Sequence, residues 1–140
     1  MSKQNNTIDT DTSLCSCGSS KLAAKCCVPF LNGEAIPATA EALMRSRYVA
    51  YSKARIDYIE QTMIGPASER FDSSRAKEWA IENQWLNLNI LSSQTKGEIA
   101  YVEFIARFRS QGHTQHQHEK SEFHLCNDRW YYYDGVILPP

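Results

Sequence analysis

The chain has 140 residues and a net charge of −1, from 15 basic and 16 acidic side chains. A chain of this length forms one domain of ordinary size and buries enough surface to fold without disulfide bonds. Because its charge is nearly balanced and its basic residues are scattered, the sequence lacks the overall basic field of proteins that bind nucleic acids or anionic membranes.

The first residues, 1–13, are polar and are expected to form a mobile tail. They lack the apolar segment of a signal peptide, and no apolar run approaches the roughly 20 residues of a membrane span. We therefore expect a cytoplasmic protein, whose thiols stay reduced. After the tail we expect two parts, a cysteine-rich knuckle at residues 14–30 and a second domain at residues 37–140, joined by a connector containing proline and glycine.

Three helices are predicted in the second domain, at residues 39–54, 55–63 and 72–83. Thr39 is a good N-cap for the first, and Asp72 or Ser73 suits the N-terminus of the third. The second helix is expected to stop at Gly65-Pro66, because glycine and proline interrupt helices.

Four strands are predicted next, at residues 85–93, 96–112, 113–126 and 128–135. Polar and apolar residues alternate in the first of them, which predicts that Leu86, Leu88 and Ile90 share the inward face. The last three strands are separated by short turns and therefore pair as antiparallel neighbours. Helices followed by antiparallel strands indicate an α+β fold.

Four cysteines, Cys15, Cys17, Cys26 and Cys27, have the spacing C-x-C-x8-C-C. Two pairs of thiolates folded across a turn can surround one Zn²⁺ ion, and the metal then supplies most of the folding energy of so small a segment. A disulfide and a redox centre are the alternatives. The reducing compartment disfavours the first, and the absence of C-x-x-C near a βαβ unit disfavours the second. The spacing alone leaves open whether both Cys26 and Cys27 bind the metal.

The segment "CSCGSSKLAAKCC" resembles the SEC-C motif, a zinc-binding module of the protein-export motor SecA. Ser16 and Ser20 replace the usual proline and second glycine of this motif. "LMRSRYVAY", "VEFIARF", "HEKSEF" and "WYYYDG" extend the resemblance, in the same order, to the YchJ-like family of bacterial SEC-C proteins. The resemblance covers about residues 14–135. It implies that the four cysteines ligate zinc, and that three helices pack on a curved, cone-forming antiparallel sheet in a nuclear-transport-factor-2-like domain. The family has no established activity.

A cone closed by helices leaves a cavity at its open end, which is a common place for a ligand. Strand alternation and the first helix suggest ten candidate pocket residues: Arg45, Arg47, Glu103, Arg107, Glu119, Ser121, Phe123, Trp130, Tyr132 and Asp134. Neighbouring arginine and glutamate side chains form an acid–base pair, a carboxylate clamp or a structural ion-pair network that joins helix to sheet. The sequence marks no nucleophile, and no catalytic residue is assigned.

The leading hypothesis is a zinc-binding adaptor whose knuckle docks on another protein, the ribosome or the export machinery, by similarity to the SEC-C motif of SecA. The rival is a small-ligand-binding protein or an enzyme that uses the cone pocket, which is an analogy at the level of the fold. A third interpretation is that zinc only stabilises the N-terminal segment.

Overall fold

The computed structural model describes residues 13–139, so the tail predicted at residues 1–13 lies outside the described residues apart from Ser13. Six helical segments precede four strands. The helical segments are η1 (Ala23–Lys25), α2 (Val28–Leu31), α3 (Ala40–Ser52), α4 (Ile56–Gln61), α5 (Gly65–Arg70) and α6 (Ser73–Glu82), and the strands are β1 (Gln84–Lys96), β2 (Ile99–Ser110), β3 (His113–Cys126) and β4 (Arg129–Ile137).

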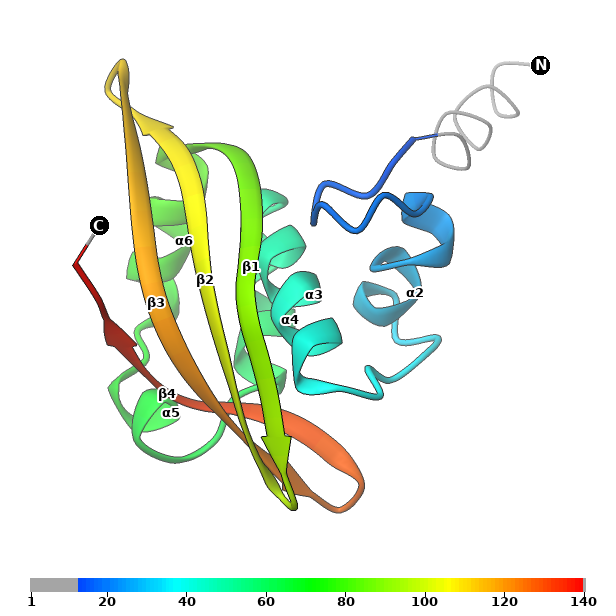
Figure 1. The fold of residues 1–140 in the computed structure, drawn as a ribbon. Coiled ribbons are helices and arrows are strands. Elements are labelled where there is room, and N and C mark those ends of the chain that lie inside the picture. Colours follow the sequence, from blue (N-terminus) through cyan, green and yellow to red (C-terminus); the bar gives the residue numbers. More distant parts are fainter. Residues whose placement is uncertain (1–12, 140) are drawn as a thin grey trace.

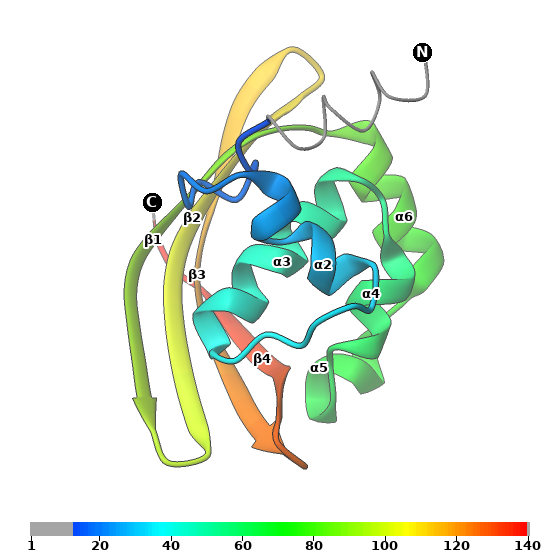
Figure 2. The same cartoon turned by 90° about the vertical axis from the view of Figure 1, so that its right-hand side faces the viewer.

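The sheet is an antiparallel meander in the order β1-β2-β3-β4, as predicted. It bends strongly, and helices α3 to α6 lie on its concave side (Figures 1 and 2). Helix α2, which follows η1, lies on the side of α3 opposite the sheet (Figure 1). Within the described part of the chain, no helix is long and apolar enough to cross a membrane.

The central helix α3 begins where the sequence predicted it. The hydroxyl of Thr39 accepts a hydrogen bond from the Ala42 backbone N–H at 3.0 Å, which satisfies a donor at the open end of the helix. The predicted cap of α6 is also present, since the Asp72 carboxylate accepts from the Arg75 backbone N–H at 3.1 Å.

The prediction for Gly65-Pro66 was wrong. Helix α4 already ends at Gln61, and Gly65 and Pro66 open α5, a helix that was not predicted from the sequence. Proline is favoured in the first turn of a helix, where its missing N–H has no partner to lose. Gly65 has φ +72°, and a Cβ at this position would clash with the ring of Tyr133. The dipeptide therefore starts a helix, although the same residues also suit a helix end.

The inward face predicted for β1 needs one correction. Leu86 is exposed, because a β-bulge between Trp85 and Asn87 changes the side on which the following residues lie. Trp85 points inward in its place, while Leu88 is buried as predicted. The inward face of β2 has no such break, and its alternate residues from Ala100 to Phe108 are all buried.

One continuous buried cluster joins the knuckle to the sheet and helices. It contains Cys15, Cys17 and Cys27 together with residues such as Leu43 of α3 and Phe123 of β3. Full burial of a large apolar side chain contributes about 1.5–3 kcal/mol. Because the cysteines share this cluster, the knuckle obtains part of its stability from the cone. The division into a knuckle at residues 14–30 and a cone at residues 37–140 stays a prediction.

Candidate metal site and pocket

The sulfur atoms of Cys15, Cys17, Cys26 and Cys27 converge on one point. All four Sγ atoms lie within 4.8 Å of one another, and Cys26 Sγ is 3.6 Å from Cys17 Sγ and 3.8 Å from Cys27 Sγ. Tetrahedral Zn²⁺ with Zn–S bonds of about 2.3 Å requires S–S separations of about 3.8 Å. The four thiols are free, and their arrangement can hold a metal ion.

A short backbone turn brings the first cysteine pair to this point. The Cys15 N–H donates to the Lys21 carbonyl at 2.8 Å, and Leu14 pairs with Leu22 in an isolated β-bridge. Gly18 closes the turn with φ +83°, and a Cβ there would lie 3.0 Å from the carbonyl oxygen of Leu88 in β1. Glycine is thus required both by the backbone conformation and by the close approach of the sheet. The second pair lies where η1 ends and α2 begins.

Three of the four cysteines are buried, and Cys26 is half-buried. The hydroxyl of Ser19 lies 3.1 Å from Cys26 Sγ and accepts a hydrogen bond from the Lys21 N–H, so its own hydrogen is available to the sulfur. Hydrogen bonds from Cys15 and then Cys27 hold the pKa of Cys17 well below its usual range. Hydrogen bonds to Cys15 and Cys17, together with burial, raise the pKa of Cys27. A divalent cation bound by the four sulfur atoms would favour the thiolate form of all of them.

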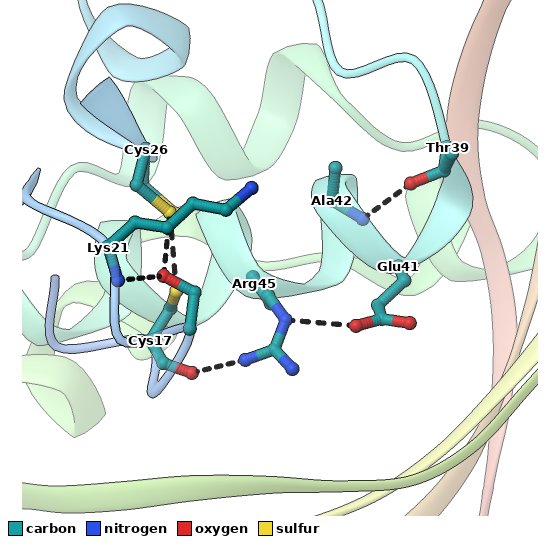
Figure 3. Close-up of polar contacts among 9 residues, drawn as sticks. Cys17, Lys21, Cys26, Thr39, Glu41, Ala42 and Arg45 are labelled. Carbon is teal, nitrogen blue, oxygen red and sulfur yellow. Dashed lines mark hydrogen bonds and ion pairs between the residues drawn. The ribbon is translucent and has the colours of Figure 1, made fainter.

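Arg45 connects the metal site to α3 (Figure 3). Its Nη1 donates to the backbone carbonyl of Cys17 at 2.7 Å, and its Nε forms an ion pair with Glu41 at 3.1 Å. A groove of about 430 Å³ lies beside this contact, between the knuckle and the first turns of α3. Its lining includes Lys21, Lys25 and Phe30.

A separate pocket of about 370 Å³ lies between α3, α5, α6 and the inner face of the sheet. The carboxylate of Glu119 is buried against it and accepts three hydrogen bonds, from Tyr132 Oη at 2.8 Å, Ser121 Oγ at 2.6 Å and Gln117 Nε2 at 2.8 Å. Burial, and then the charge of Glu119, raises the pKa of Tyr132, which keeps its hydroxyl protonated and able to donate. Arg47 lies over the Tyr132 ring, with its Cζ 4.6 Å from the ring centre.

Comparison with known proteins decides the family. Residues 39–135 match the family model described as "YchJ, middle NTF2-like domain". The chain belongs to the YchJ-like family. A UPF0225 protein of Geobacter sulfurreducens is 42% identical over 132 residues, which cover 92% of this chain and 82% of that protein.

Two solved structures of proteins with a SEC-C motif are also similar. The solution structure of one from Rhodopseudomonas palustris is 41% identical, with a TM-score of 0.84 over 91% of this chain and 100% of that one. The crystal structure of one from Psychrobacter arcticus is 28% identical, with a TM-score of 0.76 over 94% of this chain and 86% of that one. These findings confirm the predicted resemblance and the nuclear-transport-factor-2-like α+β fold.

Of the ten residues predicted to form the pocket, the structure brings only some together. Arg47, Glu119 and Tyr132 line the pocket. Ser121 and Phe123 are fully buried on the same face of β3, where Ser121 supports Glu119.

The other five predicted residues lie elsewhere. Arg45 and Arg47 are two residues apart on α3, which places them on opposite sides of the helix, and Arg45 faces the knuckle. Glu103 and Arg107 lie on the outer face of β2, where they contact His118 at 2.7 Å and Asn87 at 3.2 Å.

Trp130 and Asp134 are the remaining two. Trp130, at the start of β4, is buried in the core. A bulge at Tyr133 pairs Asp134 with Glu122 and turns it away from Tyr132, so that it forms an ion pair with Arg70 of α5 at 2.7 Å.

The aromatic wall of the pocket and one polar residue were not among the pocket residues predicted from the sequence. The wall comes from different elements, namely Tyr48 and Tyr51 on α3, Trp79 on α6, Trp85 on β1 and Phe104 on β2. No local pattern connects these residues. Gln117 was detectable, because it lies two residues before Glu119 and strand alternation places both on one face.

Proposed function

We propose that the four clustered cysteines bind Zn²⁺ and that the metal-bound knuckle docks on a protein partner in the cytoplasm. The observation that carries the metal assignment is the convergence of four sulfur atoms within 4.8 Å. A donor set made only of thiolates favours zinc over magnesium or calcium, which prefer oxygen ligands. The Zn²⁺ ion would link the turn that holds Cys15 and Cys17 to the start of α2.

The exposed side of the knuckle supports the docking part of the proposal. Leu14 and Leu22 pair across the β-bridge and remain 65% and 37% exposed. Lys21 and Lys25 lie close by and line the groove beside α3. Four thiolates on Zn²⁺ carry a net charge of about −2, which the two lysines offset. The knuckle therefore presents a nearly neutral surface with two exposed leucines, which suits a protein more than a nucleic acid.

Metal analysis tests the first part. Protein purified without chelator is expected to contain about one equivalent of zinc, as one tetrahedral cluster requires. Cys17→Ser is expected to lose most of it. Cys126→Ser is the matched control, because Cys126 is exposed at the end of β3 and outside the cluster. Equal zinc content in both variants, or a wild-type protein with less than about half an equivalent, would contradict the assignment.

Affinity capture tests the second part, with the ribosome and the export machinery as the first candidates because of the resemblance to the SEC-C motif of SecA. Leu14→Ser together with Leu22→Ser is expected to release the partner while zinc is retained. Ile81→Ser, at a 64% exposed position on α6, is the control for loss of an exposed apolar side chain. A double variant that captures every wild-type partner would rule out docking through this surface.

A further inference from the structure

The pocket in the cone combines an aromatic wall with a buried cation. Trp79 and Trp85 meet edge to face, with ring centres 4.9 Å apart, and Tyr51 meets Trp79 in the same way at 5.7 Å. These contacts hold the rings in fixed orientations along the wall of the pocket. The wall is therefore suited to the flat, apolar body of a small ligand.

Arg47 is the cation, and it is only 4% exposed. Its Nη1 donates to the Ile59 carbonyl at 3.0 Å and to Thr62 Oγ1 at 2.7 Å, which fixes the guanidinium group in place. Within residues 13–139, nothing accepts a hydrogen bond from its Nε or Nη2 atoms. Burial lowers the pKa of Arg47, because a low-polarity environment disfavours its charge. An anion in the pocket would compensate that charge.

Glu119 forms no ion pair with Arg47 among the described residues. Its two oxygens accept hydrogen bonds from Tyr132, Ser121 and Gln117, and its negative charge favours the charged form of Arg47 only from a distance. Arg75, which also lines the pocket, likewise has no counter-ion within residues 13–139. Arg70 is different, because Asp134 neutralises it. Two arginines from two different helices, the buried Arg47 and the exposed Arg75, thus line the same cavity without an ion-pair partner within residues 13–139.

We propose that this pocket binds a small aromatic carboxylate, whose carboxylate pairs with the Nε–Nη2 edge of Arg47 while its ring packs against Trp79 and Trp85. A guanidinium edge matches a carboxylate with two parallel hydrogen bonds. The volume of about 370 Å³ is at the small end for ligand sites, which typically range from about 300 to 1,000 Å³. The proposal does not depend on what the knuckle binds.

Calorimetry and two-dimensional NMR on the zinc-loaded full chain test the proposal with three probes that share one ring: phenylacetate, phenethyl alcohol and phenethylamine. Phenylacetate is expected to bind at one saturable site and to shift the indole N–H signals of Trp79 and Trp85. The alcohol is expected to bind at least about tenfold more weakly, the factor that corresponds to loss of a charged hydrogen bond. Binding of the amine at least as tight as that of phenylacetate, or no binding of phenylacetate, would overturn the proposal.

Two variants connect the binding to the pocket. Arg47→Met is expected to weaken phenylacetate binding by at least about tenfold, and Arg107→Met, on the outer face of the sheet, to leave it unchanged. Because Arg47 is buried and its loss can unfold the chain, Ala76→Phe provides an independent test. Ala76 lines the pocket from α6, so the larger ring would occupy the space of the ligand without removing a hydrogen bond. Folded Ala76→Phe protein that binds phenylacetate like the wild type would refute the assignment.

Discussion

Gly135 in β4 offers a sharp test of the buried carboxylate of Glu119. It pairs with Ser121 across the sheet, and a Cβ at this position would overlap Oε2 of Glu119 and the hydroxyl of Tyr132. Gly135 is not among the glycines with positive φ, so alanine there causes no backbone strain. Gly135→Ala must therefore act through this contact, by forcing Glu119 away from its donors.

Gly135→Ala is expected to reduce stability in two ways, by weakening the hydrogen bonds to Glu119 and by overpacking the site. A hydrogen bond to a charged group contributes about 1.5–3 kcal/mol, and overpacking of a tight site costs about 1–3 kcal/mol. We expect Gly135→Ala to lower the free energy of unfolding by about 3–5 kcal/mol, measured by urea denaturation of the zinc-loaded protein.

Two further variants separate this effect from a general effect of replacing glycine. Gly97 has φ +65°, and a Cβ added there would meet no atom of the described residues within 4 Å, so Gly97→Ala is expected to cost about 1–2 kcal/mol from backbone strain alone. Tyr132→Phe removes one of the two groups that the new methyl would meet. The double variant Tyr132→Phe/Gly135→Ala should therefore lose less than the sum of the two single variants. Additive losses, or a Gly135→Ala loss no larger than that of Gly97→Ala, would refute the proposed crowding.

Three other predictions concern the knuckle and the outer face of the sheet. Arg45→Met should lower the free energy of unfolding by about 2 kcal/mol, since the Cys17 carbonyl loses a charged donor, and Arg109→Met should change it by less than about 0.5 kcal/mol in the same urea assay. Removal of zinc with a chelator should lower the melting temperature, and Cys126→Ser should respond in the same way as the wild type; an unchanged melting temperature would count against a structural metal. Glu103 and the Pro139 carbonyl raise the pKa of His118, so the stability from this contact is fully present below about pH 6.5 and is lost as pH rises through the raised pKa. An NMR titration should show this raised pKa and its return toward the ordinary value in Glu103→Gln.

Local signals predicted most of the fold. Thr39 and Asp72 were recognisable as N-caps because a cap depends on one side chain and the three residues after it. The inward face of β2 was predictable because its alternation is uninterrupted from Ala100 to Phe108. The bulges near Leu86 and Tyr133 were not, since one extra residue reverses the face of a strand without changing its composition.

The cysteine cluster and the pocket also differ in how far the sequence could predict them. The four cysteines lie within thirteen residues, so their spacing alone predicted a cluster. The separation of Arg45 from Arg47 follows from helix periodicity and was predictable, but the pocket also depends on the aromatic residues that several elements bring together and on the bulge that turns Asp134 outward. Such features come from packing between distant elements, and a single sequence contains no direct record of them.

The two sites meet in one element, because α3 has the knuckle on one side and the pocket on the other. Arg45 holds the Cys17 carbonyl, and Arg47, two residues later, lies in the pocket wall. An effect of the metal on the affinity for phenylacetate would therefore have to pass through a shift or rotation of this helix. Since Arg47 is also fixed to α4 by the Ile59 carbonyl and to Thr62, a small movement on the knuckle side need not displace its guanidinium group. Equal affinity for phenylacetate with and without zinc would mean that these bonds isolate the pocket from the knuckle. A reciprocal change in the affinities for phenylacetate and for zinc would identify α3 as the coupling element.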